Sequence, residues 1–257
     1  MKRWFKDSRI KKYAVMSSIL AGIVLLMGFV SGEQSDKTIK DIYVHVDYQH
    51  DNYFVGKSDV LNLITLSGAD AIIGQYVDNI SLKELEVRVK SHNFVEDAQI
   101  YKDHKGNLTV NVTQCKPIAR IIDLKGPNAY IGENGNSLPS SAKFTARVML
   151  IDGPYAEKLK STEFLQSDKG KAYFDLINYI SMDRFWKAQI AQMTIERDGE
   201  IVFYTQIGDQ KIEFGKPDDI EEKFQKLKIF YKRIYPFKGY NHYKRVSLKF
   251  KNQIVCE

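Results

Sequence analysis

Side chains of the kinds used in catalysis and metal binding are dispersed along this sequence. Five histidines are present: His45, His50, His92, His104 and His242. None has a second ligand at a spacing that zinc sites use. Serine motifs of the form G-x-S-x-G or S-x-x-K lack supporting context, and there is no phosphate-binding loop. The residue types predict no catalytic residue, no metal site and no cofactor.

Paired carboxylates are the remaining candidates for acid and base chemistry. They gather in one short stretch: Asp218, Asp219, Glu221 and Glu222. This stretch opens a predicted helix, whose amino-terminal dipole end favours negative charge. A structural role therefore explains these carboxylates without catalysis. We expect a binding protein that is not an enzyme and has no small-molecule substrate.

The carboxyl-terminal end is the most suggestive binding surface. No acidic residue occurs between Lys223 and Cys256, while lysines and arginines recur throughout. A solvated basic face is one interpretation. The other is a docking strand, because the unpaired backbone of an edge strand can accept a strand from a partner. The sequence RVSLKFKNQIV alternates as a final strand should, with Val246, Leu248 and Phe250 on one face.

Short elements precede this strand in the second half of the chain. Apolar runs separated by turn residues predict strands at 118–122, 129–131, 148–151, 191–196, 200–206 and 211–214. Apolar residues at helical spacing predict a helix around 173–180 and another over 220–234, begun by Asp218 and ended before Pro236. We expect residues 117–257 to form a mixed β-sheet domain with flanking helices.

The first half predicts a smaller domain. Alternation marks strands at 39–46, 94–102 and 108–112, and apolar spacing marks a helix capped by Ser58 and a second capped by Ser81. In the second helix, spaced charges predict the ion pairs Glu84 with Arg88 and Glu86 with Lys90. Two helices on one face of three strands make a small domain over residues 37–116. The fold class of the whole chain is α+β.

Residues 13–32 form an uncharged run of a length that can cross a bilayer once as a helix. Six basic residues precede it, which favours a cytoplasmic tail over residues 1–12 and an extracytoplasmic remainder. A cleaved signal peptide is the alternative, but the run is longer than most such segments and offers only a loose cleavage site. We expect an uncleaved transmembrane helix.

Composition excludes other classes of protein. Much of the net charge of +6 comes from the tail before residue 13, so it does not predict nucleic acid binding. Cys115 and Cys256 are the only cysteines, and we expect small buried thiols rather than a disulfide.

Four segments together resemble the FtsQ/DivIB family of bacterial cell-division proteins. They are Phe94-Val95-Glu96-Asp97-Ala98-Gln99-Ile100, Leu108-Thr109-Val110-Asn111-Val112, Lys116-Pro117-Ile118-Ala119 and Tyr130-Ile131-Gly132-Glu133-Asn134-Gly135. They resemble the family patterns F/W-V-x-x-A-x-V, L-x-V-x-V, P-x-A and Y-x-x-D-x-x-G. Gly132 stands where an acidic residue is common, and Cys115 where a charged residue is. The order of elements over 37–116 resembles a POTRA domain.

The resemblance implies a non-enzymatic divisome scaffold in the inner, cytoplasmic membrane at the division septum, with most of the chain in the periplasm. It implies partners of the FtsB and FtsL kinds, bound by addition of a strand to the last strand of the chain. The matching residues here are Tyr243, Arg245, Val246, Ser247, Leu248, Lys249, Phe250 and Lys251. A membrane-anchored envelope enzyme, a peptidoglycan-binding protein and a POTRA-bearing chaperone or secretion component are the alternatives.

Overall fold

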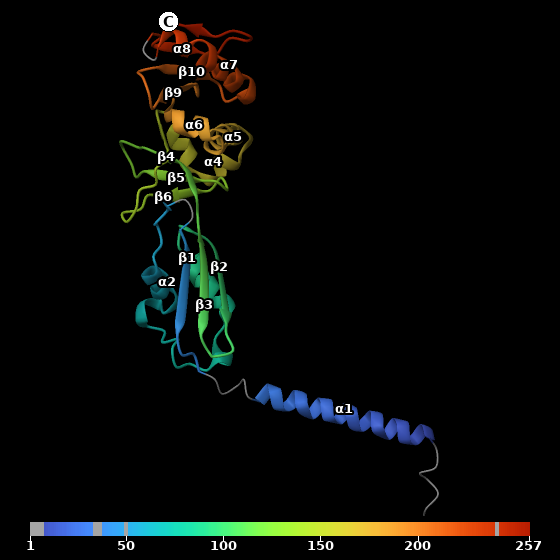
Figure 1. Cartoon of the computed structure of the whole chain (residues 1–257). Helices are drawn as coiled ribbons and strands as arrows, with labels where there is room; N and C mark the ends of the chain where they lie inside the picture. The colour runs from blue at the N-terminus through green and yellow to red at the C-terminus, as the bar shows by residue number, and fades with distance from the viewer. Residues whose placement is uncertain (1–7, 33–37, 49–50, 240–241) are drawn as a thin grey trace, which may run out of the picture. The chain divides into compact units, whose positions relative to one another are not determined.

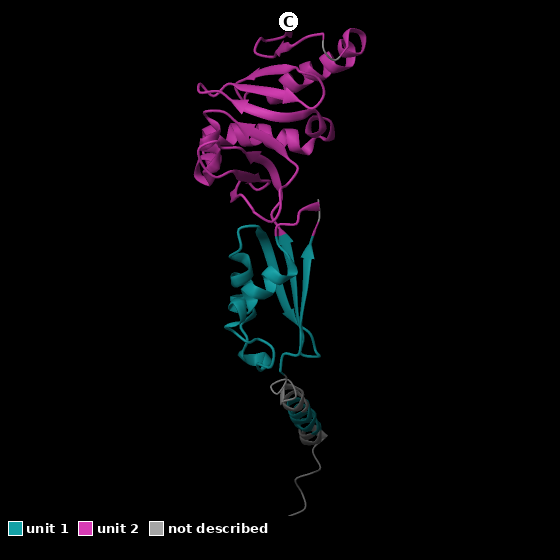
Figure 2. Cartoon of the chain, turned by 90° about the vertical axis from the view of Figure 1, so that its left-hand side faces the viewer, with its two compact units in different colours: residues 1–47, 55–113 teal, residues 48–54, 114–257 magenta. Residues whose placement is uncertain are grey.

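The computed structural model of the chain describes residues 8–32, 38–48, 51–239 and 242–257 (Figure 1). Of residues 8–11, 14 and 26–32 it describes the backbone alone. The chain divides into two compact units (Figure 2). Unit 1 comprises Met1–Asp47 and Val55–Thr113, and unit 2 comprises Tyr48–Phe54 and Gln114–Glu257. Each unit is described by itself below.

The first helix, α1 (Ser8–Gly32), contains the whole of the predicted membrane-spanning segment 13–32. In the part of the chain that the structure describes, no helix is both long enough and apolar enough to cross a membrane.

Unit 1 places two helices against a small sheet, as the sequence predicts. The strands β1 (Ile42–Asp47), β2 (Val95–Lys102) and β3 (Leu108–Gln114) lie in the order β1-β3-β2, and β1 runs parallel to β3. The helices are α2 (Lys57–Ile64) and α3 (Leu82–Lys90). Alternate strand residues, including Val44, Leu108 and Val110, are buried, as the period of two requires.

The helix caps are partly as predicted. Ser81 caps α3, and its hydroxyl accepts the amide of Glu84 at 3.3 Å. The predicted cap of α2 at Ser58 is wrong, because Gly56 occupies that position and its amide donates to the carboxylate of Asp59 at 2.9 Å. Asp59, at the third helical position, thus accepts the backbone amide of Gly56, as the third residue of a capping box does.

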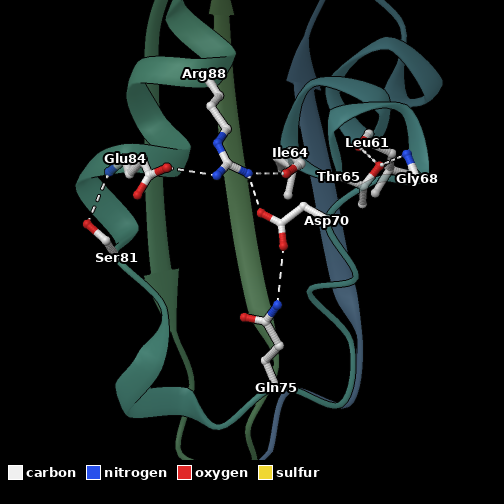
Figure 3. A network of polar contacts seen from close by, with 9 residues as sticks. All are labelled: Leu61, Ile64, Thr65, Gly68, Asp70, Gln75, Ser81, Glu84 and Arg88. Carbon is white, nitrogen blue, oxygen red and sulfur yellow. Dashed lines mark hydrogen bonds and ion pairs between the residues drawn. The ribbon is translucent and has the colours of Figure 1, made fainter.

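Arg88 ties the two helices of unit 1 together (Figure 3). Its guanidinium donates to Asp70 at 2.7 Å, to the carbonyl of Ile64 at 3.0 Å and to Glu84 at 2.8 Å. The predicted pair of Glu84 with Arg88 is confirmed. Hydrogen bonds to Asp70 and then Glu84 raise the pKa of Arg88. A rigid guanidinium fork can meet all three acceptors, whereas a lysine ammonium could not hold this geometry.

Lys90 has a different partner from the one expected. Its ammonium lies 2.6 Å from the carboxylate of Asp97 on β2. Glu86 instead accepts the backbone amide of Ile100 at 2.9 Å. The predicted pairing of Glu86 with Lys90 along the helix is therefore wrong, because both side chains reach across to the neighbouring strand.

Replacement of Arg88 by alanine is expected to destabilise unit 1 by about 1 to 2 kcal/mol, because it leaves the carbonyl of Ile64 without this donor and Asp70 with Gln75 as its remaining side-chain donor. Amide hydrogen exchange of buried α2 and α3 residues such as Val60 should then be faster by a factor of roughly 5 to 30. The control variant Lys83→Ala removes an exposed cation of the same helix and should leave exchange within about twofold. Equal exchange rates in the two variants would contradict a stabilising role for the hydrogen bonds of Arg88.

Unit 2 is built on one mixed sheet. Its nine strands, counted over the described residues, follow the order β12-β11-β10-β9-β8-β7-β4-β5-β6. Their bounds are β4 (Pro117–Ile121), β5 (Ala129–Gly132), β6 (Ser137–Pro139), β7 (Met149–Asp152), β8 (Ile190–Ile195), β9 (Ile201–Thr205), β10 (Lys211–Gly215), β11 (Arg245–Ser247) and β12 (Val255–Cys256). The central strands β4, β7 and β8 are parallel to one another, and the outer pairs are antiparallel apart from β10 with β11.

Helices supply the other layer of the unit 2 core. They are α4 (Thr162–Gln166), α5 (Asp168–Met182), α6 (Arg184–Gln189), α7 (Ile220–Arg233) and α8 (Tyr235–Lys238). Trp186, Phe224 and Phe230 are at most 1% exposed and pack in one cluster with strand residues such as Phe203 and Phe214. Ring centroids of Phe214 and Phe224 lie 5.4 Å apart. The α+β class of the sequence prediction is confirmed, with α7 packed against the β10 end of the sheet.

The start of α7 differs from the prediction by one residue. Asp219, in a left-handed conformation with φ of 46°, precedes the helix, whereas Asp218 was the expected cap. Asp218 instead forms an ion pair with the buried Lys223. Asp218 and Glu222 of this turn thus form ion pairs within the helix region, with Lys223 and Lys226.

Candidate partner-binding site

The predicted docking strand lies inside the sheet rather than at its edge. β11 pairs with β10 on one side and with β12 on the other. Leu248 donates its amide to the carbonyl of Glu213 at 2.9 Å, toward β10. Arg245 donates to the carbonyl of Glu257 at 3.0 Å, toward β12. The expectation that residues 245–251 form an edge strand is therefore wrong, because the chain turns after Leu248 and returns alongside β11.

β12 is the edge strand at this end of the sheet, within the residues described. Glu257 exchanges two backbone hydrogen bonds with Arg245, at 3.0 and 2.9 Å, and Cys256 lies opposite Val246. In an antiparallel ladder, bonded and non-bonded residues alternate. The amide and carbonyl of Cys256 therefore point away from β11, toward the open edge, where an added strand could pair with them.

The predicted site residues separate into a buried set and an exposed set. Val246 and Leu248 are fully buried and Ser247 is 4% exposed, so their side chains belong to the domain core. Lys249, Phe250 and Lys251 are exposed. The predicted alignment of Phe250 with Val246 and Leu248 is wrong, because Phe250 lies beyond the end of β11 and is 49% exposed.

Tyr243 has a supporting role at the start of β11. Its ring is half-buried, 6.1 Å from the ring of Phe230 on α7, and its carbonyl accepts a hydrogen bond from Gln210 at 2.9 Å. These contacts bind the chain to the helix layer before the strand begins. Tyr243 thus positions β11 and offers only part of its surface to a partner.

Two cations of the predicted site already have carboxylate partners. The guanidinium of Arg245 lies 3.2 Å from Glu213 and 2.5 Å from Glu257, and the hydrogen bond to Glu257 is the main cause of its raised pKa. Lys249 pairs with Glu200, which raises the pKa of the ammonium. The basic composition of this end is therefore neutralised in part by acids from β10 and from the turn before β9.

The helix beside the edge adds exposed apolar side chains. Lys226 on α7 donates to the carbonyl of Phe250 at 3.1 Å and so fixes the turn between β11 and β12 to the helix. Ile229, on the same helix, is 53% exposed, and Phe237 on α8 is 85% exposed. Large exposed apolar side chains are typical of interaction surfaces, and α7 is in contact with the turn before β12.

Two features of this site escaped the sequence prediction. β12 has only two residues, Val255 and Cys256, too few for an alternation pattern. The only signal for the turn before it is Lys251-Asn252, where Asn252 adopts a positive φ of 61°, as asparagine does more readily than most residues. Cys115 is buried and Cys256 is half-buried, the two are not joined by a disulfide, and burial raises the pKa of the Cys256 thiol.

Other chemistry is sparse in the described residues. No group of three or more histidine, cysteine or acidic side chains there is placed to hold a metal ion. His242 packs edge-on against Tyr243, with ring centroids 4.6 Å apart, and His92 accepts the amide of Phe94 at 3.2 Å. These histidines thus have structural neighbours.

Two models of known protein families match the chain. The model of a family described as FtsQ/DivIB, C-terminal related, matches residues 116–257, which is more than half of the chain. The chain belongs to the FtsQ/DivIB family. A POTRA-like domain matches residues 37–113, in front of the family's carboxyl-terminal domain. No curated protein matches the chain.

The resemblance inferred from the sequence motifs is thus confirmed at the level of the family. The motif Lys116-Pro117-Ile118-Ala119 begins the carboxyl-terminal match and forms the start of β4. The motif that begins at Tyr130 forms β5 and the turn after it. The partner-binding role of residues 243–251 stays a prediction.

Leu248 and Phe250 were predicted to share one face of the strand, but Leu248 is buried and Phe250 is exposed. Leu248→Ala is expected to destabilise the FtsQ/DivIB-type domain by about 2 to 5 kcal/mol, because it opens a cavity in a packed core. Phe250→Ala, at an exposed position, should cost less than about 1 kcal/mol. Urea unfolding followed by Trp186 fluorescence measures both, and equal losses would place Phe250 in the core after all.

Proposed function

We propose that the protein is a non-enzymatic scaffold of the bacterial divisome, and that it binds partners of the FtsB and FtsL kinds. Membership of the FtsQ/DivIB family supports the division role. The observation that carries the binding mode is the open edge of β12 beside α7, since Cys256 presents an unpaired amide and carbonyl there. A partner segment in extended form would continue the sheet as a further strand.

The exposed groups around β12 suit such a partner. Phe250 precedes the turn, Lys251 is part of it, and Ile229 is exposed on α7. Backbone pairing would supply part of the affinity, the apolar side chains would supply burial, and the cations would steer an acidic segment. The buried residues Val246, Ser247 and Leu248 would act indirectly, by holding β11 and hence β12 in place.

A proline at position 256 tests strand addition. Cys256→Pro removes the outward amide without removing a bond between β11 and β12. We expect it to weaken binding of the FtsB-like extracytoplasmic segment about tenfold or more, measured by isothermal titration with the full chain. Cys256→Ala keeps the amide and should bind within about threefold of the unchanged protein.

A second variant separates loss of the edge from loss of the fold. Val255→Pro removes the amide that faces Ser247, so it should lower the melting temperature, whereas Cys256→Pro should leave the melting temperature within a few degrees. Undiminished partner binding by a folded Cys256→Pro protein would exclude strand addition at β12.

We also propose that residues 13–32 anchor the protein in the cytoplasmic membrane, with residues 1–12 in the cytoplasm and the rest in the periplasm at the septum. The printed sequence supports this, since the segment carries no charge and six basic residues precede it. A single anchor would concentrate the partner-binding edge near other membrane-bound division proteins.

Alkaline carbonate extraction of membranes tests the anchor. The unchanged protein should stay in the membrane pellet, whereas a variant with Leu20→Lys and Val24→Lys should be released, because each charge costs several kcal/mol at the centre of a bilayer. Release of the unchanged protein, or an amino terminus that begins after residue 32 in the mature protein, would contradict the proposal.

A further inference from the structure

A hollow region lies at the central strands of the unit 2 sheet, away from β12. A cavity of about 320 Å³ opens where the parallel strands β4, β7 and β8 begin, between them and the ends of α5 and α6 (β4, α5 and α6 are labelled in Figure 1). Its floor is apolar, with Ile118, Ile180 and Ile190 from three different elements, each at most 6% exposed. The space is larger than one buried aliphatic side chain needs.

A second hollow of about 360 Å³ adjoins the first. The two share the wall formed by Arg147, Val148 and Lys187. The second also has aromatic walls, with Tyr53 53% exposed and its ring 5.7 Å from the ring of Phe144. Tyr53 belongs to unit 2, so both hollows, here called the paired groove, lie within one compact unit.

The charge of the paired groove is positive. Arg147 and Lys187 are exposed on its shared wall, and none of the ion pairs described in the structure uses either of them. Lys116 is neutralised by Glu133 at 2.6 Å, and Asp51 is the carboxylate in the described lining. Two cations lie between an apolar hollow and a mixed hollow with aromatic walls, which complements an anion flanked by apolar groups.

We propose that the paired groove binds an extended peptide segment of a partner protein that has an acidic residue between two apolar residues at alternate positions. In an extended chain, alternate side chains point the same way about 7 Å apart, so residues i, i+2 and i+4 face one surface. The acidic side chain binds Arg147 and Lys187. One apolar side chain enters the hollow over Ile180, and the other lies against Tyr53 and Phe144.

This site is separate from the β12 edge in residues and in chemistry. At β12 a partner would pair through backbone groups. The apolar residues considered there are Ile229 on α7 and Phe250 at the turn between β11 and β12. In the paired groove, side chains provide recognition, and no strand edge is needed. The protein would thus engage two partner segments, or two parts of one partner, by independent contacts.

A defined probe tests the groove. The probe is a fluorescein-labelled peptide with the sequence Gly-Ser-Leu-Ser-Glu-Ser-Leu-Ser-Gly, titrated with the full chain and followed by fluorescence anisotropy. We expect saturable binding with a Kd below about 1 mM, weakening as salt rises. Peptides with Lys in place of Glu, or with Ser in place of both Leu, should bind at least about tenfold more weakly.

Matched charge reversals locate the binding. Arg147→Glu with Lys187→Glu should weaken the probe about tenfold or more, whereas Lys228→Glu with Lys232→Glu, an equal change of net charge at exposed positions of α7, should leave it unchanged. Thermal melting checks that both proteins are folded. Cys256→Pro should not alter probe binding, so the test of the groove is independent of the test of β12.

Three results would overturn the inference. They are a probe that does not saturate, a probe that binds equally to the two reversed proteins, and a disaccharide peptide from peptidoglycan that binds through Arg147 and Lys187 where the probe does not. The last result would assign the groove to the cell wall instead of to a protein.

Discussion

Backbone pairing of β11 on both sides is the constraint on which the carboxyl-terminal end of the protein depends. β11 enters the sheet parallel to β10, and the returning chain adds β12 as its outer neighbour. The pairing with β10 buries Val246 and Leu248 against the aromatic cluster beneath α7. The pairing with β12 leaves one strand of two residues at the edge. A very short edge strand limits unwanted association and still provides a template for a partner's strand.

The sequence predicted the elements that have a clear period. The strands of unit 1, the helix α3 with its Ser81 cap and the long helix α7 all follow from apolar spacing and capping chemistry. What it could not predict depends on contacts between distant residues. Arg88 reaches Asp70 as well as Glu84, and Lys90 pairs with Asp97, because the fold brings carboxylates from distant parts of the chain within reach.

The candidate site shows the same limit. Alternation over residues 245–251 indicated a strand, but periodicity cannot tell a strand in the interior of a sheet from one at the edge. β11 lies inside the sheet because the chain turns back at Asn252 and adds β12 as its neighbour. β12 is too short to show a period in the sequence. The basic composition was also informative only in part, because Arg245 and Lys249 meet carboxylates from β10 and from the turn before β9. The paired groove had no sequence signal, since its walls come from three strands, two helices and several loops that are far apart in the sequence.

The central claim is that the sheet of this FtsQ/DivIB-family protein is extended at β12 by a partner. Amide hydrogen exchange at Cys256, resolved by fragmentation mass spectrometry on the full chain with and without the FtsB-like segment, tests it most directly. The account predicts that this outward amide exchanges much more slowly in the complex, while the amide of Leu248, already bonded to Glu213, changes little. Unchanged exchange at Cys256 in a saturated complex would contradict the account.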